Sequence, residues 1–365
     1  MFLNYIFFLI SNFIYIYFFL FFYNSNSAQK NNIIKINEKK LPIKIIHFKS
    51  YKKNIIYNSN KIILGDNIIY INKNGYIKKT FRNKILWCNF YKINKNLINS
   101  DLIYSLGKIF VILSNGQINC LDSINGNIIW TIYLNNLILS TPIITDNIIF
   151  IKACDNELYA LNKYNGKILW HNKFYNNNIY LLTQISPLII NNIIIINNDK
   201  EILFIEKLSG EEKWKYYMNN IKNNNLLEIH HDYKNLYLCY KNGFLYKYNL
   251  KKKYIIWKRK YNTFNKILIT CKSIILIDIN SKIKTINKKN GNILWENNQF
   301  INMSLNNIIC IDNIIFILST NGFVIILNKE SGEIKSKFFL KKSFKLEKFY
   351  KSPIIYRKKI YIISE

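Results

Sequence analysis

The sequence predicts an all-β protein folded as an eight-bladed β-propeller. Tryptophan recurs at a nearly constant interval, with gaps of 43, 40, 44, 43 and 38 residues, at Trp87, Trp130, Trp170, Trp214, Trp257 and Trp295. Two turn signals and several short apolar runs accompany most of these tryptophans. A repeat of about 40 residues built from strands and turns is typical of propellers, in which each repeat forms one four-stranded blade.

The clearest repeat ends at Trp170 and contains three expected strands, at residues 148–151, 157–161 and 167–171. These runs are short and rich in β-branched and aromatic residues, which favours strand over helix. The tight turns Asp155-Asn156 and Asn165-Gly166 separate them, because asparagine and glycine tolerate a positive φ. A fourth strand is expected to begin at the Thr141-Pro142 step, since proline is confined to strand starts and edges.

Seven repeats reach about Lys342, and an eighth, incomplete repeat runs from Ser352 to Ser364. The strand-like stretch Pro42–Lys49 lies outside the first full repeat and is expected to supply a missing strand that closes the ring. Closure would remove the long unpaired edges of an open ring. We therefore expect eight blades, with seven as the alternative. The expected regions are a signal peptide or membrane anchor (1–28), a segment that closes the ring (29–58) and the propeller (59–365).

The segment Ala160–Trp170 resembles the tryptophan docking motif of the pyrroloquinoline-quinone (PQQ) type repeat, and Cys120–Trp130 is a second near match. Over residues 59–365 the chain is similar to the BamB family of outer-membrane protein assembly factors. This resemblance implies a periplasmic, non-enzymatic scaffold that works with a BamA-like barrel protein and other subunits of the assembly machine. The repeated tryptophans are expected to be structural docking residues, each wedged against the next blade and burying about 150–250 Å².

The alternative function is that of a membrane-anchored propeller of PQQ-type repeats that binds another partner. Quinoprotein dehydrogenases carry the same repeat, so a PQQ-dependent dehydrogenase is a third and less favoured hypothesis. The resemblance implies that such enzymes bind calcium through carboxylate and amide ligands and carry a disulfide between adjacent cysteines. This sequence has no Cys-Cys pair and only 21 acidic residues against 52 basic ones. We expect no catalytic residues and no cofactor.

Metal-binding patterns are weak in this sequence. The six cysteines are scattered without a Cys-x-x-Cys pair, which argues against zinc, although two of them could still form a disulfide in an oxidising compartment. His230-His231-Asp232 is the cluster that most suggests a metal. Adjacent residues of a strand point to opposite faces, so the two histidines could not easily bind one ion, and we expect no metal site.

The N-terminus indicates export. Residues Phe2 to Tyr23 are almost continuously apolar, and small residues at Ser25 and Ser27 suit cleavage by a signal peptidase. The stretch has no Lys or Arg before it and is long enough to span a bilayer, so an uncleaved anchor is the alternative. The resemblance implies a lipid-modified cysteine near the N-terminus, but the first cysteine here is Cys88.

The net charge of +31 normally suggests nucleic acid or an anionic membrane as a partner. The lysines are spread over every repeat, and runs such as Lys251-Lys252-Lys253 fall at turns, where charge is ordinarily solvated. No platform of aromatic and arginine side chains for single-stranded nucleic acid is recognisable. We therefore expect no nucleic-acid binding, and at most a weak attraction to anionic lipid.

Partner contacts are expected in the connections between blades, which vary without disturbing the sheets. The resemblance places a BamA-contacting loop at residues 176–184, where Leu181 and Leu182 occupy the expected apolar positions but no arginine is present. The next connection, residues 223–228, keeps only Glu228 of an expected acidic pair. The alternative is that Leu181 and Leu182 simply begin an inner strand, or that a partner adds a strand to a blade edge.

Overall fold

The computed structural model describes residues 44–49, 61–64, 67–71, 75–81, 84–90, 100–174, 185–198, 201–218, 226–263, 267–301, 303–340, 353–356 and 359–364. Leu181, Leu182 and the apolar N-terminal stretch lie outside the described residues. Among the described residues, helical structure is confined to one 3₁₀ turn, η1 (Cys154–Asn156). In that part of the chain, no helix has the length and apolar character that crossing a membrane requires.

Seven antiparallel sheets of four strands follow one another along the chain. The first three comprise β2 (Lys61–Leu64), β3 (Asn67–Ile71), β4 (Tyr76–Phe81) and β5 (Lys84–Phe90); β6 (Ser100–Ser105), β7 (Lys108–Leu113), β8 (Gln117–Asp122) and β9 (Ile128–Tyr133); and β10 (Ile143–Ile144), β11 (Ile148–Lys152), β12 (Glu157–Asn162) and β13 (Ile168–Lys173). The predicted strands of the Trp170 repeat are thereby confirmed to within two residues.

The next four sheets repeat this meander. They comprise β14 (Leu188–Ile190), β15 (Ile193–Asn198), β16 (Glu201–Glu206) and β17 (Glu212–Tyr217); β18 (Leu226–His231), β19 (Asn235–Tyr240), β20 (Phe244–Asn249) and β21 (Tyr254–Lys260); β22 (Leu268–Ile269), β23 (Ser273–Ile277), β24 (Ile283–Asn287) and β25 (Ile293–Asn297); and β26 (Leu305–Ile311), β27 (Ile314–Ser319), β28 (Phe323–Asn328) and β29 (Ile334–Phe339).

A three-stranded sheet joins the two ends of the described chain. Its strands are β1 (Lys44–Lys49), β30 (Ile354–Tyr356) and β31 (Lys359–Ser364), in the order β1-β31-β30. β1 pairs in parallel with β31, from Lys44 opposite Lys359 to Lys49 opposite Ser364. The parallel pair is formed by strands from opposite ends of the sequence, whereas β30 and β31 pair antiparallel as neighbours in the chain.

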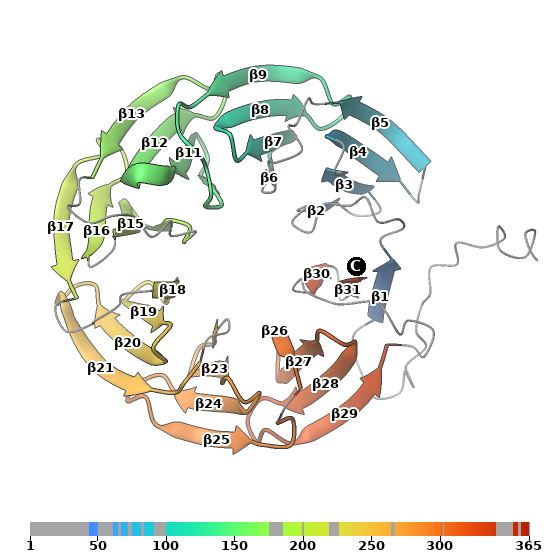
Figure 1. Ribbon diagram of the computed structural model, residues 1–365, viewed down its shortest axis with the longest axis vertical. Coiled ribbons are helices and arrows are strands. Elements are labelled where there is room, and N and C mark those ends of the chain that lie inside the picture. The colour runs from blue at the N-terminus through green and yellow to red at the C-terminus, as the bar shows by residue number, and fades with distance from the viewer. Residues whose placement is uncertain are drawn as a thin grey trace, which may run out of the picture.

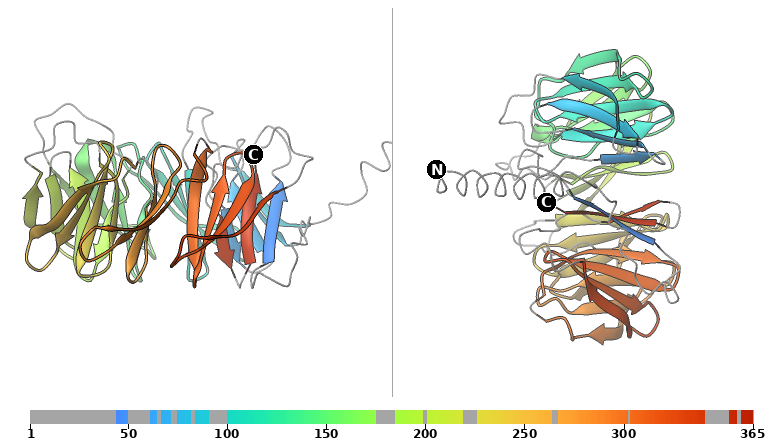
Figure 2. Two further views of the ribbon diagram at one scale, coloured as in Figure 1. Left: turned by 90° about the horizontal axis from the view of Figure 1, so that it is seen from below. Right: turned by 90° about the vertical axis from the view of Figure 1, so that its right-hand side faces the viewer.

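The sheets stand around a ring, with the first strand of each four-stranded sheet nearest the centre and the fourth at the perimeter (Figure 1). Seen from the side, the ring is a disc (Figure 2). This arrangement follows from the sequence pattern: the middle strands of a sheet are buried on both faces, as in β11 and β19, so each sheet must pack against a neighbour on either side. The protein is therefore an all-β propeller.

The core consists of apolar layers between successive sheets. Phe110 and Ile118 of one sheet pack with Ile149 and Tyr159 of the next in a single buried cluster. A similar layer connects the last four-stranded sheet to the three-stranded one, because Ile360 and Ile362 of β31 belong to the same cluster as Phe316 and Val324. In the last four-stranded sheet, Ser336 occupies the position where the other sheets have tryptophan, opposite Ile326.

Candidate partner-binding site

The repeated tryptophans lie on the outer strands and contact the following sheet. Trp170 is typical: its Nε1 donates a hydrogen bond of 3.2 Å to the carbonyl of Lys207, and its ring lies against Gly210. A Cβ atom on Gly210 would sit 2.7 Å from Cε3 of that ring, closer than side chains pack. Equivalent tryptophan-to-carbonyl bonds link Trp87 to Ser123, Trp130 to Lys163, Trp257 to Lys288 and Trp295 to Lys329.

Sequence reasoning missed a second side chain in these contacts. The asparagine two residues after tryptophan donates to the carbonyl of the same glycine: Asn172 to Gly210 at 2.5 Å, Asn297 to Gly332 at 3.0 Å, and Asn89 to Gly126. The signal was present as Trp-x-Asn in three repeats. The abundance of asparagine elsewhere in the chain hid it.

Some lysines that were expected to be solvated have structural contacts instead. Lys163 lies in the turn after β12, and Lys152 is the last residue of β11. Lys163 is 1% exposed, and its Nζ donates to Ser105 Oγ at 2.9 Å and to the Asp146 carbonyl at 3.0 Å. Lys152 Nζ donates to the Asn197 carbonyl at 2.7 Å, and burial lowers the pKa of Lys152 to about 8. Part of the positive charge is therefore buried between neighbouring sheets.

Glu228, the predicted acidic contact, lies on β18, the innermost strand of its sheet (Figure 1). Its carboxylate is 2.8 Å from Nε2 of His230 and accepts a hydrogen bond of 3.4 Å from the backbone nitrogen of Ile267, which precedes β22. The side chain is 22% exposed. Glu228 is thus fixed between two sheets, with part of its carboxylate open to solvent.

The segment His230-His231-Asp232 does not act as one cluster. His230 faces Glu228, whereas Nδ1 of His231 accepts a 3.3 Å hydrogen bond from the backbone of Tyr233. Burial lowers the pKa of His231, which favours the neutral ring. No group of three metal-ligating side chains occurs among the described residues.

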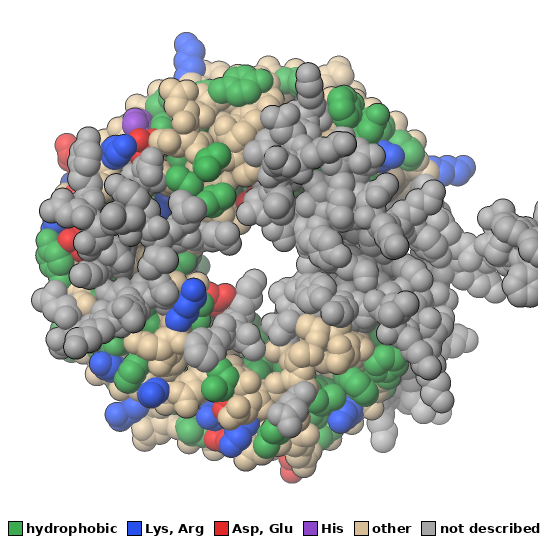
Figure 3. Space-filling view, in the orientation of Figure 1, with side chains coloured by type: hydrophobic (Ala, Val, Ile, Leu, Met, Phe, Trp, Pro, Cys, Tyr) green, Lys and Arg blue, Asp and Glu red, His purple; other side chains and the backbone are tan. Residues whose placement is uncertain are grey.

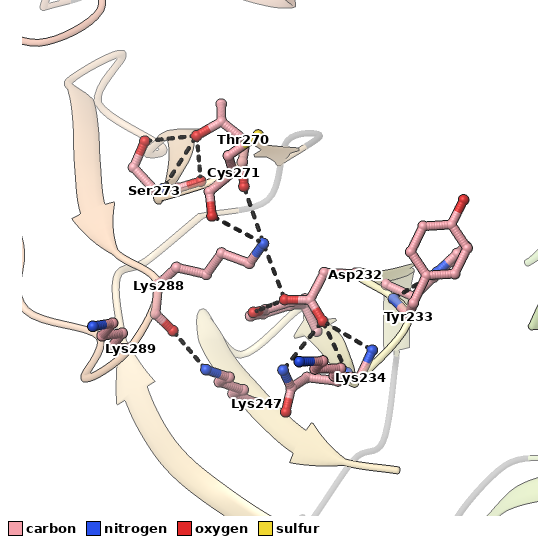
Figure 4. Close-up of polar contacts among 12 residues, drawn as sticks. Asp232, Tyr233, Lys234, Lys247, Thr270, Cys271, Ser273, Lys288 and Lys289 are labelled. Carbon is pink, nitrogen blue, oxygen red and sulfur yellow. Dashed lines mark hydrogen bonds and ion pairs between the residues drawn. The ribbon is translucent and has the colours of Figure 1, made fainter.

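Asp232 joins an ionic cluster between the sheets β18–β21 and β22–β25 (Figure 4). Lys288 Nζ lies 3.0 Å from Asp232 Oδ2 and also donates to the carbonyl of Thr270 at 3.1 Å. Tyr237 and the Asn235 backbone donate to the same carboxylate at 2.8 and 2.9 Å. Burial raises the pKa of Asp232, but the hydrogen bonds from Lys288, Tyr237 and Asn235 outweigh it and lower the pKa to about 2.

A second cluster surrounds Glu157 on β12. Its carboxylate accepts hydrogen bonds from Tyr159 at 2.6 Å and from Asn136 of the preceding connection, and lies 3.3 Å from Lys173 Nζ and 3.4 Å from His171. Burial opposes ionisation, but the hydrogen bonds from Tyr159, Asn136 and Lys173 outweigh it, so the pKa of Glu157 is lowered. The hydrogen-bonding capacity of this carboxylate is taken up by its neighbours, and the bond from Asn136 fixes the preceding connection to the sheet.

The thiols of the ring interior are unsuited to nucleophilic chemistry. Burial raises the pKa of Cys120 to about 11 and that of Cys239 to about 12, so both stay protonated at neutral pH. All six cysteines of the sequence lie among the described residues, and none of them forms a disulfide. The described carboxylates and thiols thus have structural surroundings, in contacts within and between the sheets of the ring.

A family model described as outer membrane protein assembly factor BamB matches residues 81–297, more than half of the chain. The chain belongs to the BamB family. The match runs from the end of β4 to the end of β25 and so covers β5 and the five four-stranded sheets from β6 to β25. The recognised PQQ-type repeat propeller is confirmed.

Relatives in the BamB family are distant. The BamB of Shewanella oneidensis is 24% identical over 264 residues, which cover 70% of this chain and 66% of that protein. The BamB of Yersinia pestis is 20% identical, with 75% and 71% covered. An uncharacterized protein of Rickettsia conorii is 23% identical, with 58% and 55% covered. The chain thus spans just under two thirds of the first of these relatives.

Solved structures share the fold. The crystal structure of BamB from Moraxella catarrhalis has a TM-score of 0.64 at 16% identity and covers 84% of this chain and 94% of its own. Sqt1 of Saccharomyces cerevisiae has a TM-score of 0.62 at 10% identity, with 80% and 87% covered. Because the second is a yeast protein of another name, the ring architecture by itself does not specify the BamB role.

Proposed function

We propose that this chain is a non-enzymatic scaffold of outer-membrane protein assembly that works through contacts with a BamA-like barrel protein and other subunits of the assembly machine. The BamB family match across residues 81–297 is the observation that carries the proposal. The described site agrees with it: the half-buried carboxylate of Asp232 and the buried one of Glu157 are held by local partners, which leaves the ring surfaces and connections to bind.

The three-stranded sheet is proposed to be an eighth blade that closes the ring. β1 adds to β31 in parallel, and Ile360 and Ile362 pack on the sheet β26–β29. Residues 29–58 then form the closing segment and residues 59–365 the propeller. An eighth blade made from both chain ends would act as a clasp, because the ring could not open without breaking the β1 pairing.

The residues proposed for partner contact are Leu181, Leu182 and Glu228. Glu228 lies on β18, the strand of its sheet nearest the centre of the ring, and belongs to the connection predicted at residues 223–228. The six tryptophans are proposed to dock neighbouring blades and to have no direct part in partner binding. The hydrogen bonds of Trp170 and its counterparts to the next sheet support this division of roles.

Residues 1–28 are proposed to be a signal peptide that delivers the propeller to the periplasmic side of the outer membrane. The uncleaved form, a propeller anchored through Phe2–Tyr23 and serving another partner, is the competing hypothesis. The mature N-terminus distinguishes the two, because cleavage is expected near Ala28 whereas an anchored protein keeps Met1.

The test is affinity purification of the tagged protein from its native membrane, with mass spectrometry of the proteins that accompany it and of its own N-terminus. We expect a BamA-like barrel protein and a start near Ala28. The variant Leu181→Asp with Leu182→Asp should reduce recovery of that protein at least tenfold. Leu208→Asp is the control and should leave recovery unchanged. Leu208 is 66% exposed in the turn between β16 and β17.

Two results would overturn the proposal. Recovery of an intact Met1 end without any barrel protein would favour an anchored propeller of another complex. Equal recovery with the Leu181/Leu182 variant and with the Leu208 control would remove the proposed contact residues and leave the family role to be explained by another surface.

A further inference from the structure

Exposed large apolar side chains occur on every four-stranded sheet but are more frequent on the first two, β2–β5 and β6–β9, than on the other five. We call those on β4, on the outer strands β5 and β9, and in the turn before β9 the apolar sector: Tyr76, Phe81, Ile85, Leu86, Phe90, Ile124, Ile128, Ile129 and Tyr133. Leu86 is 54% exposed and Tyr133 is 65% exposed. Figure 3 shows hydrophobic side chains along this part of the perimeter. Such a concentration on a folded protein usually indicates a binding surface.

The part of the sector on β9 and in the turn before it is poor in charge, whereas Lys78 and Lys79 lie on β4 and Lys84 begins β5. Residues 109–151 contain no lysine or arginine, although the whole chain has 52 basic residues among 365. Their acidic residues are Asp122 and Asp146, and Asp122 Oδ1 accepts the backbone hydrogen bond of Ile124 at 2.6 Å within its own turn. On the far side of the ring, β21 ends in Lys258-Arg259-Lys260, all exposed. The β9 part of the contact surface could therefore leave water with little loss of ionic hydration, while the lysines of β4 and β5 stay at its basic side.

The rest of the molecule supplies strong positive charge. The net charge of +31 favours approach to an anionic surface from any direction, whereas the apolar sector favours one orientation on arrival. Exposed Lys84 lies beside the sector, immediately before Ile85. The combination of apolar side chains and a basic flank is typical of proteins that rest in the interface of a bilayer.

We propose that the apolar sector rests on the surface of an anionic bilayer, so that the ring stands edge-on with β5 and β9 toward the lipid. The side chains of the sector enter the interface between headgroups and acyl chains, and lysines at its flank contact lipid phosphates. This contact goes beyond the proposed partner protein. Purified protein and lipid vesicles test it with no assembly machine present, so the two proposals can fail separately.

The test is cosedimentation of the mature protein, which is proposed to start near Ala28, with vesicles of phosphatidylglycerol and phosphatidylethanolamine. The sector variant Leu86→Asp with Ile129→Asp changes the residues that immediately precede Trp87 and Trp130. The control, Ile256→Asp with Leu294→Asp, changes the residues that precede Trp257 and Trp295 across the ring; these are 39% and 55% exposed. Both variants change the net charge equally, so they differ only in the place of the change.

We expect the sector variant to bind at least tenfold more weakly than the wild type and the control to bind within about twofold of it. Thermal unfolding of both variants verifies that each is folded. Equal losses in the two variants would show that whole-molecule charge alone drives binding and would overturn the oriented contact. No binding of the wild type to these vesicles would overturn the lipid surface as the occupant.

Native cysteines provide a second readout. Cys88 on β5 and Cys271 in the turn before β23 are both exposed, and a polarity-sensitive dye can be attached to either one. The protein labelled at Cys88 carries Cys271→Ser, and the protein labelled at Cys271 carries Cys88→Ser. Both also carry Cys154→Ser and Cys310→Ser and keep the buried Cys120 and Cys239. With vesicles, the dye at Cys88 should shift to a less polar emission while the dye at Cys271 stays unchanged. A shift at Cys271 alone would contradict the proposed orientation.

Discussion

Two neighbouring sheet contacts solve the same packing problem differently. At the contact of Trp170 with the next sheet, the turn position is Gly210, with φ of +77°. At the contact of Trp214, the same position of the turn is Lys253, with φ of +57°. Both residues close the turn with a backbone hydrogen bond to the residue four before, Glu206 at 2.9 Å and Asn249 at 2.8 Å.

The consequences appear in the tryptophan. Trp170 Nε1 reaches the Lys207 carbonyl, whereas Trp214 Nε1 is buried beside the Tyr248 hydroxyl and donates to no carbonyl of the described residues. Lys253 places its Nζ 4.4 Å from the centre of the Trp214 ring instead. The left-handed turn is thus possible for lysine, and glycine is required for a different reason, which is the close approach of the ring.

The largest expected effect comes from replacing Gly210. It separates the requirement for a positive φ from the requirement for space beside the Trp170 ring. Gly210→Ala adds a Cβ both at a positive φ and 2.7 Å from the Trp170 ring, so it should lower the free energy of unfolding by about 3 kcal/mol. Gly107→Ala is the matched control, because Gly107 has the same φ of +77° and nothing within 4 Å of the added Cβ. It should cost about 1 kcal/mol. Urea unfolding measures both, and equal losses would show that φ alone demands glycine.

A third contact, that of Trp257 with the next sheet, also involves charged side chains. Trp257 Nε1 and Lys247 Nζ both donate to the Lys288 carbonyl, at 3.4 and 2.9 Å, and Asp232 holds the side chain of Lys288. Asp232→Asn should lower the free energy of unfolding at pH 7 by about 1–2 kcal/mol, after allowance for solvent screening. The carboxyl pKa is about 2 when folded and 3.8 when unfolded, so the ion-pair contribution is present above about pH 4.

This contribution should disappear as the pH falls from about 4 to about 2. Protonation then removes in the wild type what the Asn substitution removes at neutral pH. Unfolding measured at intervals from pH 7 to pH 2 should show the difference between wild type and Asp232→Asn shrinking within that window. A difference that stays constant across it would mean that Asp232 acts through its hydrogen bonds alone.

Replacing the indole nitrogen tests the hydrogen bond in isolation. Trp170→Phe loses the bond to Lys207 and leaves that carbonyl without its donor, whereas Trp214→Phe loses a nitrogen that donates to no carbonyl of the described residues. Both lose similar ring area. Trp170→Phe should therefore be less stable than Trp214→Phe by about 1 kcal/mol in chemical unfolding. The opposite order would indicate that the Trp214 nitrogen has an unrecognised partner.

The smallest effect concerns Lys253 itself. Lys253→Gly removes the strain of a positive φ but also the cation–π contact with Trp214, so the two changes nearly cancel. Lys253→Ala keeps the strain and loses the contact, and should be less stable than Lys253→Gly by about 1 kcal/mol. Identical stabilities of the two variants, measured by thermal unfolding, would mean that the turn imposes no strain.

Much of the fold was readable from local pattern. The spacing of tryptophan and of Asn-Gly turns predicted the repeated sheets, and the strands of the Trp170 repeat end within two residues of their expected positions. The seventh sheet forms with Ser336 in place of tryptophan, because its apolar runs and its turns at Gly322 and Gly332 are intact. Periodicity carried over many copies tolerates the loss of one marker.

The candidate site was less accessible to sequence reasoning. The contacts of Glu228 with His230 were within reach, since residues two apart on a strand share a face. Its contact with Ile267 and the pairing of Asp232 with Lys288 were not, because each joins residues of two sheets. Leu181 and Leu182 remain proposed contacts, and they lie outside the described residues.

The sequence by itself determined the class of fold, the number of its four-stranded repeats and the family, because these follow from short-range periodicity and from turn residues with a required φ. Only the tertiary structure decided which carbonyl each tryptophan reaches, which lysines are buried and where the exposed apolar side chains gather on the perimeter. Those features depend on how one sheet is turned against the next. Residues about 40 positions apart meet across each interface, and no local pattern records their distance.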